Sequence, residues 1–151
     1  MLRGALKDSV DEVLEKMFFA ETLGEIEDRN VAGDFPDDEI GVRLSFEGEP
    51  PGAMCLRLTS AAARQIAADF LGLEADEISP VQVSEVVREL ANMVCGSVLS
   101  RVENAAVFRL GTPQMAAPAE PPAKMPSMTG YFVQLSNGRL AVRIGTGIPA
   151  C

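Results

Sequence analysis

The sequence contains no histidine, and its three cysteines are scattered over 151 residues. Histidine is the usual general base near neutral pH and the commonest metal ligand, so its absence removes the most frequent designs of hydrolase and metal site. Cys55, Cys95 and Cys151 include no C-x-x-C pair, which argues against a zinc site or a disulfide framework and favours a reducing compartment. Cys55 and Cys95 lie in apolar segments, where a small side chain is expected to fill the core.

Positive charge and long apolar runs are also scarce. Thirteen Lys and Arg stand against 22 Asp and Glu, which gives a formal net charge of −9. Nucleic acids and anionic membranes both require a cationic surface, so neither is expected as the main partner. No apolar run reaches the ~18 residues that suggest a membrane helix, and residues 1–13 lack the apolar stretch of a signal peptide. We therefore expect a cytoplasmic protein.

What the sequence does contain is a mixture of helical and alternating apolar patterns. Helical spacing predicts three helices, over 5–20, 61–71 and 79–104. Thr59 or Ser60 is expected to cap the second helix, and Gly72 to close it. Alternating apolar residues or turn signals predict strands over 40–46, 53–59, 106–113, 129–136 and 139–145, with a further short strand possible near 22–29. Loops are expected through Gly33 and Pro36 and over the proline-rich segment 113–127.

Asn137-Gly138 predicts a tight hairpin between the last two strands. A two-residue turn at this dipeptide would place three apolar pairs opposite one another on a single face. The pairs are Leu135 with Leu140, Val133 with Val142, and Tyr131 with Ile144.

Together these elements predict a two-layer α+β domain over residues 1–151, with about six antiparallel strands and two long helices on one face. LEKMFF at 14–19 aligns with LANMVC at 90–95, so we expect a duplicated helix-plus-three-strand plan with halves of roughly 1–78 and 79–151. The uncovered face of such a sheet is expected to be polar or to be covered by a partner.

The long helix has a clear start and two different faces. Ser79 is a good N-cap, Pro80 suits the first helical position, and Gln82 completes a capping box. One face is apolar: Val83, Val86, Val87, Leu90, Val94 and Val98. The other carries no large apolar side chain: Glu85, Glu89, Asn92, Gly96, Ser100 and Glu103. A glycine inside a helix costs about 1 kcal/mol relative to alanine. On composition alone, a solvated surface with one tolerated glycine is the simpler explanation.

Glu89-x-x-Asn92-x-x-x-Gly96, within ELANMVCG, resembles the active-site signature of the CheC/CheX/FliY phosphatases of bacterial chemotaxis. The first helix (EVLEKMFF), the duplicated plan and the final RIGTGIP are similar to a CheX-type domain. In the duplicated alignment Val13 and Lys16 fall on Glu89 and Asn92, so the motif occurs once, as in CheX.

The resemblance implies a phosphatase of the aspartyl-phosphate in CheY-like response-regulator receiver domains. Glu89 would bind the receiver's active-site lysine, and Asn92 would position the attacking water. Gly96 would let the receiver backbone come close, and Glu85, where many members have Asp or Ser, would influence docking. No cofactor or metal site of its own is implied, since Mg²⁺ would arrive with the receiver, and CheX-type proteins are homodimers.

Two alternatives remain open. One is a non-catalytic module that binds receivers or flagellar-switch components through the same helix. The other is a purely structural α+β dimer whose polar stripe has no partner.

Overall fold

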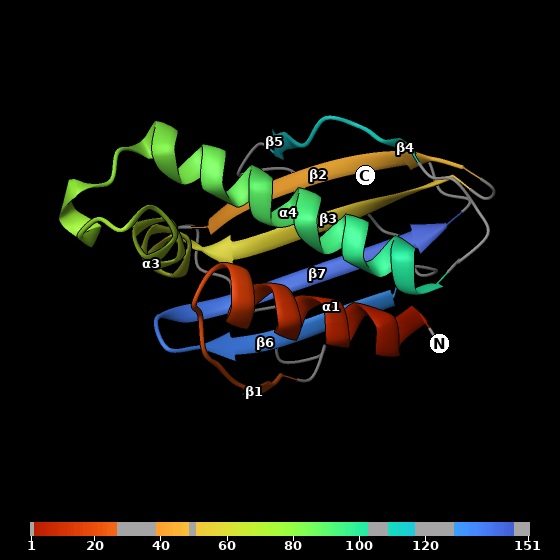
Figure 1. Cartoon of the computed structure of the whole chain (residues 1–151), viewed down its shortest axis with the longest axis horizontal. Helices are drawn as coiled ribbons and strands as arrows, with labels where there is room; N and C mark the ends of the chain where they lie inside the picture. Colours follow the sequence, from red (N-terminus) through yellow and green to blue (C-terminus); the bar gives the residue numbers. More distant parts are fainter. Residues whose placement is uncertain (1, 27–38, 49–50, 103–108, 117–128, 147–151) are drawn as a thin grey trace.

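The alternating and helical apolar patterns of the sequence form one antiparallel sheet and one layer of helices in a computed structural model (Figure 1). The structure describes residues 2–26, 39–48, 51–102, 109–116 and 129–146. The predicted loop through Gly33 and Pro36, Glu103 of the polar stripe, and Cys151 lie outside these residues.

The described elements follow the expected order of helices and strands. They are α1 (Leu2–Met17), β1 (Thr22–Glu25), β2 (Glu39–Glu47), β3 (Gly52–Thr59), α3 (Ser60–Leu71), the short 3-10 helix η1 (Ala75–Glu77), α4 (Pro80–Val102), β4 (Arg109–Leu110), β5 (Gln114–Ala116), β6 (Thr129–Leu135) and β7 (Gly138–Thr146). The strand order is β1-β6-β7-β3-β2-β4, and β5 also pairs with β2. This confirms the predicted α+β class, with seven described strands in place of about six because β4 and β5 both pair with β2 and form the edge of the sheet.

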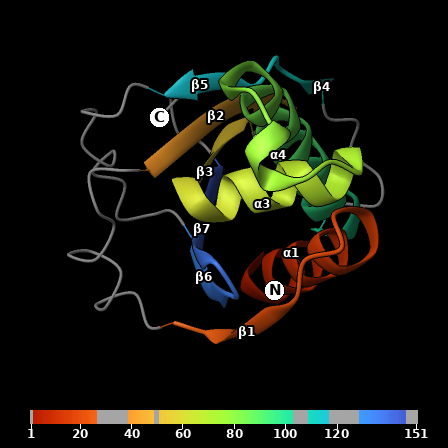
Figure 2. The same cartoon turned by 90° about the vertical axis from the view of Figure 1, so that its left-hand side faces the viewer.

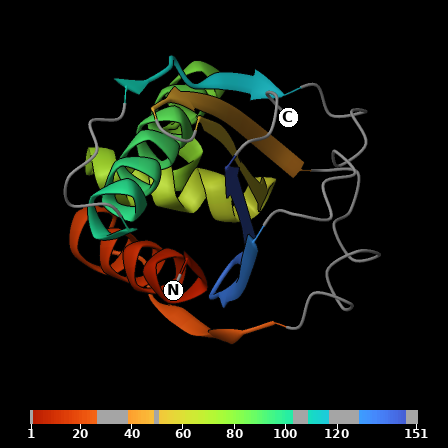
Figure 3. The same ribbon diagram turned by 90° about the vertical axis from the view of Figure 1, so that its right-hand side faces the viewer.

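The helices α1, α3 and α4 all cover the same face of the sheet (Figures 2 and 3). The core lies between the two layers. From α4 it takes every residue of the predicted apolar face: Val83, Val86, Val87, Leu90, Val94 and Val98. From the sheet it takes the alternating residues of the inner face: Val42, Leu44, Phe46, Met54, Leu56, Leu58, Tyr131, Val133, Leu135, Leu140, Val142 and Ile144. The alternating apolar residues of the strands and the helically spaced apolar residues of α4 are therefore buried in one core.

The long helix begins as the sequence predicts. The backbone N–H of Gln82 donates to the Ser79 Oγ at 3.2 Å, and the backbone N–H of Ser79 donates to the Gln82 Oε1 at 2.9 Å. This reciprocal pair satisfies two donors that would otherwise be left without partners at the start of the helix. The start of α4 is therefore determined by local sequence.

The first helix is displaced by three residues from the predicted range 5–20. It ends at Met17, whose side chain is 46% exposed. Phe18 is fully buried and stacks on Phe70 with ring centroids 4.7 Å apart. The chain then turns through Phe19 in the left-handed region at φ 56°, and the Ala20 N–H donates to the Leu14 carbonyl. The sequence did not reveal this stop because glycine, not phenylalanine, usually occupies this position.

The second helix begins one residue before the predicted range 61–71 and ends at Leu71 as predicted. Thr59 occupies the N-cap position, yet its side chain makes no capping hydrogen bond. Its Oγ1 accepts instead from the Arg139 N–H on β7 at 3.2 Å. Gly72 closes the helix in the left-handed conformation at φ 70°, as expected. The Thr59 hydroxyl, which local sequence predicts to cap the helix, therefore bonds to a residue distant in sequence instead.

The predicted register of the final hairpin is wrong by two residues. Ser136 and Asn137 form the turn, so Leu135 pairs with Gly138, Val133 with Leu140, Tyr131 with Val142, and Thr129 with Ile144. The shift is even, so every apolar side chain stays on the core face. Gly138 is needed at the first position of β7, because a Cβ there would lie 1.8 Å from the Thr59 Oγ1.

We expect Gly138→Ala to lower the free energy of unfolding by about 1–3 kcal/mol, as overpacked sites do. The Thr59 hydroxyl cannot move away without losing its hydrogen bond from Arg139. Chemical denaturation of the variant measures the change. Gly4→Ala is the control: a Cβ at Gly4 meets no atom within 4 Å, so alanine in α1 should leave stability unchanged or raise it. Equal unfolding midpoints for the two variants would contradict this interpretation of the hairpin.

The prediction of an irregular loop over 113–127 is also wrong in part. Gln114–Ala116 form β5, which pairs with Gly41–Arg43 of β2. Proline removes a backbone donor, but an edge strand needs donors on one side only, so a short strand can form directly after Pro113. Composition could not reveal this strand because β2 supplies its partner groups.

The other face of the sheet carries no helix among the described elements (Figure 2). Phe132 and Ala141 are buried there with Ile26 against them, and the Arg143 guanidinium lies 4.9 Å from the centroid of the Phe132 ring. Arg57 forms an ion pair with Glu39. The described part of this face is thus largely polar around a small apolar centre.

Candidate functional site

The helix α4 crosses the front of the sheet between α1 on one flank and β4 and β5 on the other (Figure 1). Its buried valines and Leu90 fix its inner side against the core. A 23-residue helix held along its length is a rigid support, so the side chains on its outer side keep their spacing. The predicted functional residues all belong to this helix.

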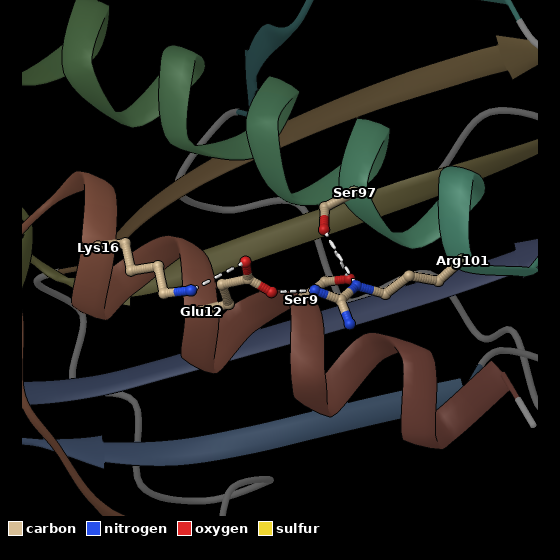
Figure 4. Close-up of polar contacts among 5 residues, drawn as sticks. All are labelled: Ser9, Glu12, Lys16, Ser97 and Arg101. Atoms are coloured by element: carbon tan, nitrogen blue, oxygen red, sulfur yellow. Dashed lines mark hydrogen bonds and ion pairs between the residues drawn. The ribbon is translucent and has the colours of Figure 1, made fainter.

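A seam of polar contacts joins α4 to α1 (Figure 4). The Ser97 hydroxyl donates to the Oγ of the fully buried Ser9 at 3.0 Å, and the Arg101 Nε donates to the Ser97 Oγ at 3.4 Å. Arg101 also forms an ion pair with Glu12, which accepts from the Lys16 Nζ at 3.4 Å. These contacts fix which flank of α4 faces α1, and so leave the polar stripe outside.

A second cluster ties α1 to the sheet. The Tyr131 hydroxyl donates to the Asp11 Oδ1 at 2.9 Å, and the Lys7 Nζ donates to the Asp11 Oδ2 at 2.8 Å. Burial and the hydrogen bond to Asp11 both raise the pKa of Tyr131. The hydrogen bond that Lys7 itself donates to Asp11 raises the pKa of Lys7. Both groups keep their protons at neutral pH, so this cluster holds α1 on β6 of the sheet under physiological conditions.

The structure brings Glu85, Glu89, Asn92 and Gly96 together along one side of α4. Glu85 and Glu89 are exposed, whereas Asn92 and Gly96 are half-buried. Leu90, next to Glu89 in sequence, is fully buried, because successive helical residues point about 100° apart. The four predicted residues therefore lie on the outer surface, and none is enclosed by the core.

Glu89 and Asn92 are available to a partner. Within the described part of the chain, no side-chain hydrogen bond or ion pair engages either residue. A spacing of three residues places the carboxylate and the amide one turn apart on the same side. The carboxylate can accept from a cation, and the amide can both donate to and accept from one water molecule. This pair can bind a cationic group and orient a water beside it.

Gly96 lies next to the chain's own edge strand. A Cβ at Gly96 would be 3.7 Å from the Leu110 Cδ1 on β4, which is ordinary van der Waals contact. An alanine would therefore be accommodated, and space inside the fold does not explain the glycine. Leu110, which sequence reasoning did not single out, is the nearest described side chain to this position. Only the pairing of β4 with β2 brings it there.

The described residues offer little for metal binding. They contain no group of three or more Cys, Asp or Glu that could hold a metal ion. Cys55 is disulfide-bonded, which contradicts the expectation of a free cysteine that only fills the core. Burial raises the pKa of the Cys95 thiol to about 12, so Cys95 stays protonated near neutral pH and acts as a core filler. Of the helices that the structure describes, none has the length and apolar character that crossing a membrane requires.

Solved structures share this fold at low sequence identity. A chemotaxis protein CheX from Vibrio vulnificus aligns with a TM-score of 0.76 and 17% identity over 97% of this chain and 96% of that chain. The CheX-CheY-BeF3-Mg²⁺ complex from Borrelia burgdorferi aligns at 0.69 and 14% over 95% and 96%. The FliM middle domain from Vibrio alginolyticus aligns at 0.57 and 11% over 97% and 91%. Likeness at these identities shows the fold alone.

A comparison with curated protein sequences found no significant match. A comparison with models of protein families did find one. The family model described as chemotaxis phosphatase CheX matches residues 40–136, a span that runs from β2 to the last turn and includes the polar stripe of α4. Because this match covers more than half of the 151 residues, the chain belongs to the CheX family of chemotaxis phosphatases.

Proposed function

We propose that this protein hydrolyses the aspartyl-phosphate of CheY-like receiver domains. The observation that carries the proposal is the exposed carboxylate of Glu89 one turn from the half-buried amide of Asn92 on α4, without described side-chain partners. The family match and the fold shared with a CheX in complex with CheY support this choice of substrate.

The proposed chemistry is attack of water on the phosphorus of an acyl phosphate. Water adds, the bond between phosphorus and the carboxylate oxygen breaks, and inorganic phosphate and a free aspartate result. The leaving carboxylate needs no protonation, so the reaction depends on positioning and on neutralising charge rather than on a strong base. The lack of histidine in the sequence is compatible with such a reaction.

In this mechanism Asn92 orients the attacking water through its amide, which works without a particular protonation state, as the glutamine of GTPases does. Glu89 accepts a charge-assisted hydrogen bond from the receiver's lysine and so fixes the register of the two proteins. Glu85, one turn before Glu89, extends the acidic surface toward the partner. Gly96 adds no side chain on the same side, which allows close approach.

Several further expectations belong to the same proposal. Mg²⁺ would come with the receiver, and the protein would bring no cofactor of its own. A receiver partner would place the protein in the cytoplasm. The homodimer stays a prediction, which analytical ultracentrifugation of the purified protein would test.

A second candidate is a module that binds a receiver or a flagellar-switch component without catalysing hydrolysis. The likeness to the FliM middle domain favours keeping it, although the TM-score of 0.57 is lower than that of the CheX structures quoted above. Phosphate release separates the two candidates. A receiver phosphorylated with acetyl phosphate should lose its phosphoryl group faster when this protein is added. Binding without acceleration would favour the second candidate.

Within this assay, Glu89→Gln is expected to raise the KM for the phosphorylated receiver about threefold, because an exposed charge pair contributes up to about 1 kcal/mol. Glu89 is exposed and contributes nothing to the core, so thermal stability should not change. Glu15→Gln, which removes a charge from the exposed side of α1, is the matched control and should leave KM unaltered. If both substitutions raise KM equally, Glu89 acts only through the net charge of the surface and makes no specific contact with the receiver.

A further inference from the structure

The edge of the sheet beside α4 presents two apolar side chains to solvent. Leu110 of β4 is 39% exposed and Met115 of β5 is 36% exposed. Leu110 pairs with Phe46, and Met115 pairs with Val42. Paired residues of adjacent strands point to the same face, and Phe46 and Val42 both point into the core. Leu110 and Met115 therefore continue the apolar, helix-covered face of the sheet beyond the cover of α4.

Leu110 adjoins the flank of α4 that carries Gly96, and β5, which carries Met115, also contacts α4. The Leu110 Cδ1 lies 3.7 Å from the place of a Cβ on Gly96, and Asn92 lies one turn before Gly96 on the same side. Both strands run along this flank, away from α1 (Figures 1 and 2). We call Leu110 and Met115 the apolar rim.

The apolar rim is held in place by backbone hydrogen bonds. The Gly111 N–H donates to the Ser45 carbonyl at 2.7 Å, and β5 pairs with β2 over three residues, Gly41–Arg43. A surface fixed in this way loses little conformational entropy when a partner covers it. The apolar rim is thus a ready contact surface.

The polar stripe needs an apolar contact surface beside it in order to bind a protein. Exposed ion pairs contribute little net binding free energy, since both charges are well solvated before they meet. Protein interfaces obtain most of their binding free energy from a few apolar or aromatic anchors that become fully covered. Glu85 and Glu89 can select a cationic partner and set its register, but they cannot hold it alone.

We propose that the apolar rim is the binding anchor for the receiver domain that reaches Glu89 and Asn92. This inference rests on the proposed function, and it commits to the receiver because the rim is continuous with the Asn92 side of α4. The receiver surface that covers the rim must itself be apolar and must lie beside the lysine that contacts Glu89. The apolar rim contributes binding free energy, and Asn92 orients the attacking water.

The test is the double variant Leu110→Ala with Met115→Ala, titrated with a receiver activated by beryllofluoride and Mg²⁺. We expect the Kd to rise roughly tenfold, which corresponds to about 1.4 kcal/mol. In the phosphate-release assay KM should rise by a similar factor, with kcat at saturating receiver unchanged. Met115→Ala alone, at a partly exposed position on the edge, gives a smaller change in the same direction and keeps the test valid if the double variant folds poorly.

Leu23→Ala on β1 is the matched control, because Leu23 is 57% exposed but lies at the opposite edge of the sheet. Its Kd should equal that of the unaltered protein. Unchanged Kd values for both rim variants would overturn the inference while leaving the proposed function intact, provided that Asn92→Ala still loses hydrolysis. Altered sedimentation of the rim variants with an unchanged Kd would also overturn it, by assigning the rim to a contact between copies of this chain. Failure of the unaltered protein to bind the receiver would reject the proposed function itself.

Discussion

Asn92→Ala is expected to reduce the rate of receiver dephosphorylation by roughly 100-fold, the scale typical of removing one positioned polar group from a transition state. The amide is half-buried on the outer side of α4 and has no described side-chain partner, so its removal should leave the fold intact. Alanine is also the best helix former. The loss should therefore appear in kcat, and receiver binding should remain close to normal.

The measurement is single-turnover loss of phosphate from an acyl-phosphorylated receiver, with circular dichroism to check the fold. Ser100→Ala is the matched control, because Ser100 is exposed on the same side of α4 two turns further along. Its rate should match that of the unaltered protein. If Asn92→Ala and Ser100→Ala hydrolyse the receiver equally fast, Asn92 does not position the water, and the non-catalytic module becomes the better explanation.

Leu90→Ala is expected to lower the stability of the fold and to leave the activity of each folded molecule unchanged, the reverse of Asn92→Ala. Leu90 follows Glu89 directly but is fully buried between α4 and the rest of the core. Removing three buried carbons leaves a cavity and should cost roughly 3 kcal/mol of unfolding free energy. At about 2–4 °C per kcal/mol for a chain of this size, the Tm should fall by roughly 10 °C.

Differential scanning calorimetry measures this shift. Val81→Ala is the control on the same helix, since Val81 is 66% exposed and should change Tm by little. Below its Tm, Leu90→Ala should retain the activity per folded molecule, because the side chain does not reach the outer surface. A Tm equal to that of Val81→Ala would show that Leu90 is not a core residue and that the orientation of α4 is different.

The two faces of α4 could be predicted from sequence because both depend on local rules. Ser79 and Gln82 form their capping box within four residues, and helical periodicity alone separates the buried Leu90 from the exposed Glu89. The motif at Glu89 and Asn92 indicated the family, and the match to the family model confirmed it. The roles of these two side chains stay predictions.

Only the tertiary structure decided what depends on residues distant in sequence. The Thr59 Oγ1 accepts a hydrogen bond from the Arg139 N–H of β7, and Gly138 begins that strand, so the hairpin register differs by two residues from the prediction. The apolar rim is the same kind of feature. Leu110 lies in a predicted strand and Met115 in a predicted loop, and pairing with β2 places both on the helix-covered face of the sheet. Local propensity fixes a helix face, whereas strand pairing needs a partner strand that the local sequence does not identify.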